Sequence, residues 1–103
     1  MKIKTSELTG AALDWAVAKA IGEYKPVAVP SYSTDWAQGG PIIERKNIGL
    51  VCQQPESTQR CAYRQTPDGE VFYYYGPTQL IAAMRCYVAS ELGDEVEIPE
   101  ELT

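Results

Sequence analysis

Residues 60–75 read RCAYRQTPDGEVFYYY, and this stretch sets the expectation for the whole fold. Polar and apolar side chains alternate over residues 60–65, which is the period of a β-strand. Residues 70–75 form a second β-prone run that is rich in aromatic side chains. The four residues between the runs, Thr66-Pro67-Asp68-Gly69, are typical of a tight turn because proline presets φ and glycine accepts positive φ. The stretch therefore predicts an antiparallel β-hairpin.

The aromatic run has two different faces. Alternation puts Phe72 and Tyr74 on one face and Tyr73 and Tyr75 on the other. One of these faces must belong to the core. The opposite face could line a ligand cleft or a subunit interface, where tyrosine is enriched, or it could reflect β-propensity alone.

Two segments have the apolar period of amphipathic helices. The first begins at Ser6 or Thr9, stops at Gly22, and has its apolar stripe at positions 13, 16, 17, 20 and 21. The second opens at Gly76-Pro77-Thr78, ends at Gly93, and repeats the stripe at positions 80, 83, 84, 87 and 88. Both segments should pack their apolar stripes against a sheet.

The other segments are shorter and less periodic. Residues 1–4 predict a short edge strand, residues 25–30 an extended piece between prolines, and residues 31–41 a loop rich in turn formers. Residues 42–50 predict a strand, and residues 53–59 a loose polar connection. We therefore expect an α+β fold, in which a small antiparallel sheet of three to four strands has two helices packed on it.

Charge is distributed unevenly along the chain of 103 residues. Residues 91–103 hold six of the fourteen acidic residues and no base, so residues 1–90 carry nine basic against eight acidic residues. We expect one domain over residues 1–93, followed by an acidic C-terminal tail over residues 94–103. An extended nucleic-acid surface is not expected, because duplex binding needs many lysines and arginines. A compact anion site built from two or three arginines remains compatible with this charge.

Several classes of site lack the residues they need. The chain has no histidine, and its three cysteines form no CxxC pair, so we expect free thiols, no metal and no cofactor. No run of apolar residues is long enough to span a membrane. No nucleotide-binding or nucleophile motif is present. We expect a protein that is not an enzyme, although a hydrolase that uses Asp35 and Glu44 stays open.

The turn-rich loop is the best candidate for a binding site. Glycines let a backbone approach a ligand closely, aromatic rings can stack on a base, and a carboxylate can accept hydrogen bonds from a ribose. The alternative is an ordinary surface turn, in which the tryptophan plugs the core, the aspartate caps local N–H groups and the glycines allow the bend. The ligand-binding residues expected here are Tyr32, Ser33, Asp35, Trp36, Gly39 and Gly40.

Arg85 is the one cation within the apolar helix expected over residues 80–92. A guanidinium at such a place suits a phosphate or a carboxylate. Alternatively, its stem lies along apolar surface and its charged head reaches water. We include Arg85 among the candidate ligand-binding residues. A hairpin arginine, Arg60 or Arg64, is the alternative for meeting a phosphate, although both also suit an ordinary surface position.

Three segments resemble the signature blocks of the NinX family of lambdoid bacteriophages. They are residues 13–19 (LDWAVAK), 32–44 (YSTDWAQGGPIIE) and 80–90 (LIAAMRCYVAS), and the acidic ending at residues 93–99 is similar too. Together they cover nearly the whole chain in the same order. The resemblance implies a small phage accessory protein that acts in the host cytoplasm.

Two functions follow as hypotheses. The first is a non-enzymatic binder of a small nucleotide-like anionic ligand, which would sequester a host defence signal by analogy with other small phage proteins. Because a small domain builds a deep pocket most easily between subunits, we expect a homo-oligomer. The second is a protein-interaction module that inhibits or redirects a host protein through the hairpin aromatics or the acidic tail.

Overall fold

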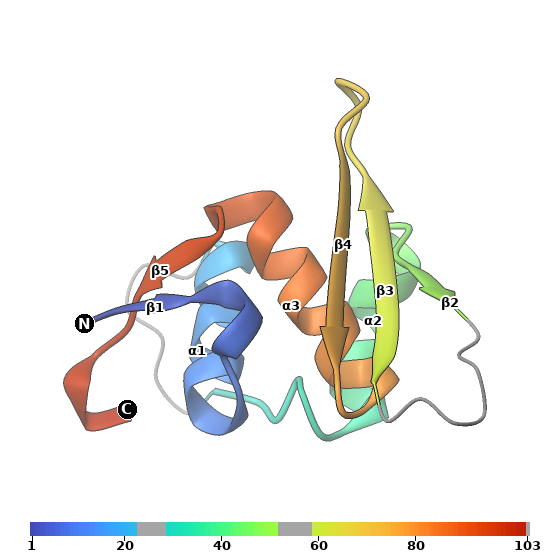
Figure 1. Cartoon of the computed structure of the whole chain (residues 1–103). Helices are drawn as coiled ribbons and strands as arrows, with labels where there is room; N and C mark the ends of the chain where they lie inside the picture. The colour runs from blue at the N-terminus through green and yellow to red at the C-terminus, as the bar shows by residue number, and fades with distance from the viewer. Residues whose placement is uncertain (23–28, 52–58, 103) are drawn as a thin grey trace.

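The expected hairpin is the centre of a three-stranded antiparallel sheet in the computed structural model, which describes residues 1–22, 29–51 and 59–102. Strands β3 (Arg60–Gln65) and β4 (Val71–Gly76) pair along their whole length, from Arg60 opposite Gly76 to Gln65 opposite Val71. Strand β2 (Gly49–Val51) pairs with β3 on its other edge. The prediction of a hairpin is confirmed, and its tip projects beyond the helices (Figure 1).

A second, two-stranded sheet joins the two ends of the chain. Strand β1 (Lys2–Lys4) pairs antiparallel with β5 (Glu95–Glu97), which confirms the short edge strand at the start of the sequence. The N-terminal amino group lies 3.0 Å from Oε2 of Glu97 and donates to the carbonyl of Ile98. Ile98 is fully buried, so the acidic segment 94–103 contributes an apolar anchor to the core.

The two helices predicted from apolar periodicity are present. Helix α1 spans Gly10–Ile21 after the short 3-10 turn η1 (Thr5–Glu7), and it ends at Gly22, which has a positive φ of 124°. Helix α3 spans Gln79–Leu92, and the hydroxyl of Thr78 caps it by accepting from the backbone N–H of Ile81. A second 3-10 turn, η2 (Glu100–Leu102), follows β5.

Helix α3 lies between the three-stranded sheet and α1 (Figure 1). It is buried on nearly every side, because one flank packs on β3 and β4 and the other on α1. The largest fully buried side chains come from α1, α3 and the segments that flank them, and they include Leu8, Leu13, Val17, Met84, Tyr87, Val88 and Ile98. The sequence therefore yields an α+β fold with two antiparallel sheets, as its class predicted.

The middle of the chain differs from the expectation. Residues 31–41 were expected as a loop and residues 42–50 as a strand, but helix α2 spans Trp36–Arg45 and leaves only Gly49–Val51 as a strand. Two glycines and Pro41 lie inside this helix, and both residue types oppose helix formation in isolation. Packing overrides this preference, because Ile42 and Gly39 are buried in contact with the core.

Two further expectations fall largely on residues that lie outside the described ranges: the extended piece at 25–30 and the loose connection at 53–59. Of the cysteines in the described part of the chain, Cys61 and Cys86 are buried free thiols. Burial raises the pKa of the Cys86 thiol to about 12, so it stays protonated and unreactive near neutral pH. Among the described residues, no helix is long and apolar enough to cross a membrane.

Candidate functional site

The predicted loop residues lie at the N-terminus of α2 instead of in an open loop. The carboxylate of Asp35 accepts from the backbone N–H of Ala37 at 2.9 Å, which makes Asp35 the N-cap of the helix. Ser33 is buried, and its backbone N–H donates to Oδ1 of Asp14 at 2.7 Å, so the segment is tied to α1. The Ser33 hydroxyl has no hydrogen-bond partner in the structure. Local capping thus accounts for Asp35 without a ligand.

Gly39 and Gly40 occupy very different surroundings. A Cβ atom at Gly39 would lie 2.4 Å from the carbonyl oxygen of Tyr32 and 2.7 Å from Cδ1 of Leu80. The nearest atom to a Cβ at Gly40 would be Cε3 of Trp36, at 3.9 Å. Gly39 therefore serves the close approach of α2 to α3 and to the loop. Trp36 is 52% exposed and does not plug the core, so its ring is open to a partner.

Replacing Asp35 with alanine should cost about 1 kcal/mol of stability, the usual value of a lost N-cap. Chemical denaturation of Asp35→Ala and Asp35→Ser measures this, because serine is also a good N-cap and should restore most of the loss. An alanine variant as stable as the parent would contradict the capping role and return Asp35 to the ligand-binding candidates.

Arg85 is held by the fold. Its Nε donates to the carbonyl of Leu8 at 2.8 Å, and its Nη1 donates to the carbonyl of Tyr75 at 2.7 Å. Burial lowers the pKa of Arg85 from its ordinary value. The guanidinium thus links the chain just after η1 to the end of β4. Sequence reasoning foresaw neither bond, and a ligand contact by Arg85 stays a prediction.

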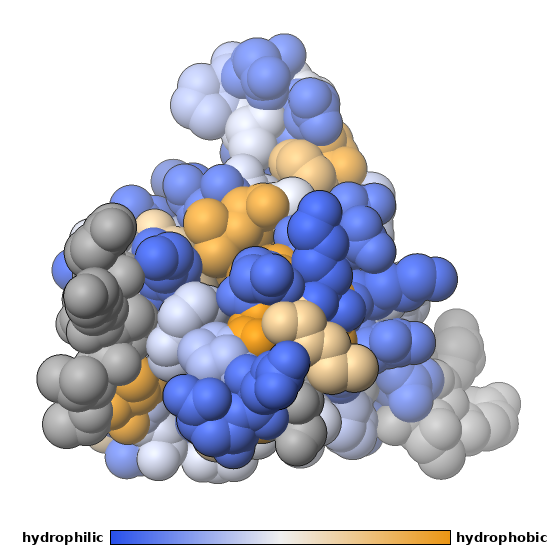
Figure 2. Space-filling model, turned by 90° about the vertical axis from the view of Figure 1, so that its left-hand side faces the viewer, coloured by the Kyte–Doolittle hydropathy of each residue, from blue (hydrophilic) through white to orange (hydrophobic). Residues whose placement is uncertain are grey.

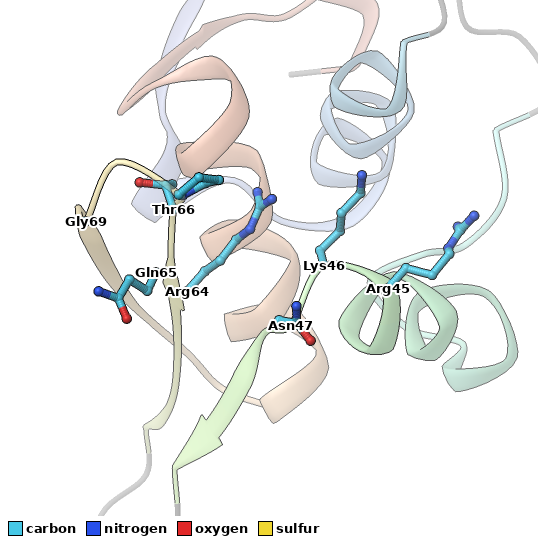
Figure 3. Close-up of a pocket in the computed structure, with 8 residues that line it drawn as sticks. Arg45, Lys46, Asn47, Arg64, Gln65, Thr66 and Gly69 are labelled. Atoms are coloured by element: carbon cyan, nitrogen blue, oxygen red, sulfur yellow. The ribbon is translucent and has the colours of Figure 1, made fainter.

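A basic groove, which sequence reasoning missed, opens between the end of α2 and the tip of the hairpin. It has a volume of about 500 Å³, within the range of small-molecule sites. In Figure 3, Arg64 from β3 and Lys46 from the turn after α2 reach toward the same space from two sides, while Arg45 points away beyond Lys46. The groove residues are Arg45, Lys46, Asn47, Arg64, Gln65, Thr66, Pro67 and Gly69.

The Arg64 side chain is held in place beside the C-terminal end of α3. Its Nη1 donates to Oγ of Ser90 at 2.6 Å and to Oε1 of Glu91 at 2.9 Å. The guanidinium carbon lies 5.6 Å from the ring centroid of Tyr87, a cation–π contact. Nε and Nη2 carry three further N–H donors in the same plane. Arg64 is therefore oriented by the fold in a way that suits a planar or tetrahedral oxyanion.

Tyr87 connects the groove with the predicted loop. Burial raises the pKa of its phenol, Glu91 raises it further, and the positive charges of Arg64 and Arg45 oppose these effects. Tyr32 is a weaker electrostatic neighbour of the same phenol. One residue of the predicted site thus lies near the groove through Tyr87, whereas Asp35 caps the opposite end of α2 from Arg45.

The missed residues left a weak signal in the sequence. Glu44-Arg45-Lys46-Asn47 was placed inside a strand, where its charges would have alternated between two faces. Instead α2 ends at Arg45, and Asn47 adopts a positive φ of 54°, which turns the chain into β2. A cation pair followed by asparagine is a helix-ending pattern, since basic residues favour the last turn and asparagine tolerates this conformation.

The carboxylates considered for hydrolysis do not meet. Asp35 and Glu44 lie at opposite ends of α2, and nine residues at roughly 1.5 Å each separate their backbones by about 13 Å. Paired carboxylates that act on one bond are about 5–10 Å apart. Within the described ranges, no group of three or more histidine, cysteine, aspartate or glutamate side chains could hold a metal ion.

Comparison with known proteins identifies the family. A family model described as "Bacteriophage P22, NinX" matches residues 21–91, which is well over half of the chain. The chain belongs to the bacteriophage NinX family. The NinX family suggested by the resemblance is thereby confirmed. The match includes the blocks at residues 32–44 and 80–90, and with them α2, the groove, the hairpin and nearly all of α3, whereas residues 13–19 and 93–99 lie outside it. No curated protein matches the chain.

Proposed function

We propose that this NinX-family chain binds a small phosphate-bearing anion in the basic groove and holds it without chemical conversion. The observation that carries this proposal is the convergence of Arg64 and Lys46, from different elements, on one groove of about 500 Å³. Arg64 is positioned by Ser90, Glu91 and Tyr87, so it loses little conformational freedom when it meets a ligand. Asn47 and Thr66 add uncharged polar groups to the lining.

The ligand in this proposal is still the anionic, nucleotide-like molecule expected from the sequence. Of the two alternatives for meeting its phosphate, Arg85 or a hairpin arginine, the proposal takes the hairpin arginine Arg64 and adds Lys46. Tyr32 remains the candidate for contact with a ring, whereas the exposed Trp36 lies at the opposite end of α2 from the groove. Sequestering such a ligand in the host cytoplasm is how a binder of this kind would act against a host defence signal. The separation of Asp35 from Glu44 supports binding of the ligand without its hydrolysis.

Removing the two groove cations should weaken anion binding at least tenfold, or about 1.4 kcal/mol. Calorimetric titration with adenosine monophosphate and with inorganic pyrophosphate compares the parent, Lys46→Gln and Arg64→Gln/Lys46→Gln. Lys4→Gln on β1 is the matched control, because it removes the same charge from an exposed site outside the groove. Phosphorus NMR of the bound probe should show no new species over hours.

The control variant Lys4→Gln distinguishes anion binding in the groove from non-specific attraction to the positive charge of the protein. Affinity that falls equally in Lys4→Gln and in the groove variants would overturn the groove as the site. The same conclusion follows if neither probe binds the folded parent at millimolar concentration. Conversion of a probe by the parent, but not by the groove double variant, would replace holding with catalysis.

A further inference from the structure

The three-stranded sheet has one face that α3 does not cover. Ala62, Arg64, Phe72 and Tyr74 face α3, and the alternating positions face outward. On β3 and β4 the outward residues are Tyr63, Gln65, Val71, Tyr73 and Tyr75, together with Cys61, which is only 4% exposed, and β2 adds Gly49 and Val51. None of these outward residues carries a formal charge.

Large apolar side chains are exposed on this outer face. Tyr63, Val71, Tyr73 and Tyr75 are 40%, 46%, 59% and 53% exposed. If a whole aromatic side chain presents roughly 150–250 Å², these four expose on the order of 400 Å². Patches of this size on a single chain often have a function. By contrast, the side of the molecule with β1 and β5 is mostly hydrophilic, with small separate apolar spots (Figure 2).

Gly49 leaves room for a tyrosine ring on the outer face of the sheet. A Cβ atom at this position would lie 2.2 Å from Cε1 of Tyr63, so the tyrosine ring lies directly over the glycine backbone. Tyr63 in turn contacts Tyr73 across the strand pair, with ring centroids 5.9 Å apart and planes tilted by 33°. Tyr63 and Tyr73 thus lie side by side over the outer face of the sheet, and sheets pack face to face through side chains of this kind.

We propose that this outer face pairs with the same face of a second copy of the chain. The absence of charge among the outward residues selects this occupant. A nucleic acid or an anionic membrane would need cations on the face. The chain carries a net charge of −5, so most surfaces of two copies repel each other, whereas two uncharged faces meet without burying an unpaired charge.

The area of the outer face sets the expected affinity of the dimer. A standard interface buries about 800 Å² per partner, so the four exposed side chains supply about half, and the rim of the strands must supply the rest. We therefore expect a weak dimer, with a dissociation constant of roughly 10–100 μM. In a two-fold arrangement the same residues of both copies meet, so one substitution changes the interface twice.

Sedimentation velocity on the full chain from about 1 μM to 1 mM tests this pairing, and it needs no ligand. The parent should shift from a mass of 11.4 kDa toward twice that value as concentration rises. Tyr73→Glu should raise the dissociation constant at least tenfold, because it brings two new charges together at the interface. Gln38→Glu is the matched control, since it adds the same charge at an exposed position of α2 and should dimerise like the parent.

Two results would overturn the proposal. One is a parent chain that stays monomeric up to 1 mM. The other is a folded Tyr73→Glu variant, checked by circular dichroism, that dimerises as well as Gln38→Glu, because another surface would then be responsible. If Tyr73→Glu does not fold, Tyr73→Ser removes the ring without adding charge, and it should still weaken the dimer several-fold. Anion binding in the groove is measured separately, so either proposal can fail while the other stands.

Discussion

Gly39→Ala is expected to destabilise the protein by about 2 kcal/mol, even though alanine is the better helix former. The added methyl group would lie 2.4 Å from the carbonyl oxygen of Tyr32 and 2.7 Å from Cδ1 of Leu80. The carbonyl belongs to the backbone and has no rotamer by which to retreat. Helix α2 must therefore move away from α3, which opens the core around Ile42 and Leu80.

The neighbouring glycine is the control for this substitution. Gly40→Ala adds the same methyl group to the same helix, but its closest contact would be an ordinary 3.9 Å to the Trp36 ring. It should stabilise the protein by about 0.5–1 kcal/mol, because alanine restricts the unfolded chain more than glycine does. Thermal unfolding should place the melting temperatures of the two variants more than about 10 °C apart. Equal stabilities would show that α2 does not dock as described.

Arg85→Met is expected to cost about 2–3 kcal/mol of stability. Methionine retains much of the apolar stem, but it leaves the carbonyls of Leu8 and Tyr75 without the donors that now lie 2.8 Å and 2.7 Å away. These bonds join two parts of the chain that are far apart in sequence, so their loss loosens the contact between η1 and β4. Denaturant unfolding monitored by tryptophan fluorescence measures the change.

A second arginine gives the matched comparison. Arg45→Met removes the same group from an exposed position, where Nε donates a long hydrogen bond of 3.4 Å to the carbonyl of Pro41. Its stability should change by less than about 0.5 kcal/mol. Lysine at position 85 reaches at most one carbonyl well and should lie between arginine and methionine. If Arg85→Met were as stable as the parent, Arg85 would be available for a ligand, as the sequence first indicated.

Local patterns predicted the elements whose own sequence contains a turn signal or an apolar stripe. The hairpin followed from a turn signal between two β-prone runs, and α1 and α3 followed from an apolar stripe with a glycine at its end. Helix α2 did not follow, because two glycines and a proline suggest a loop when the segment is judged alone. Its stabilising contacts, between Gly39, Tyr32 and Leu80, connect it to a helix some forty residues away.

In the candidate site, too, some features could be predicted from the local sequence and others were decided by tertiary packing. The sequence identified the segment from Tyr32 to Gly40 as unusual, and Gly39 does make a close approach, although to the protein's own backbone and not to a ligand. Arg85 was noticed for its charge in an apolar helix, and that charge is met by two backbone carbonyls. The sequence offered a hairpin arginine as one candidate for a phosphate, but it did not predict that Arg64 and Lys46 meet, because the two residues are eighteen positions apart on elements whose pairing was unknown.

Turn signals and apolar periodicity were therefore enough to predict a small α+β chain with its hairpin and two helices, because each of these depends on neighbours within about fifteen residues. The NinX family was indicated separately, by the resemblance of sequence blocks spread along the chain. The basic groove arises only when distant segments pack, whereas the capping of the Ala37 N–H by Asp35 is a local contact that the sequence already offered as an alternative. Packing brings the side chains of Lys46 and Arg64 to the same groove. Packing also places the carbonyl oxygen of Tyr32 so close to Gly39 that a side chain there would clash. Contacts of this kind are set by the three-dimensional arrangement of the backbone, which no local pattern contains.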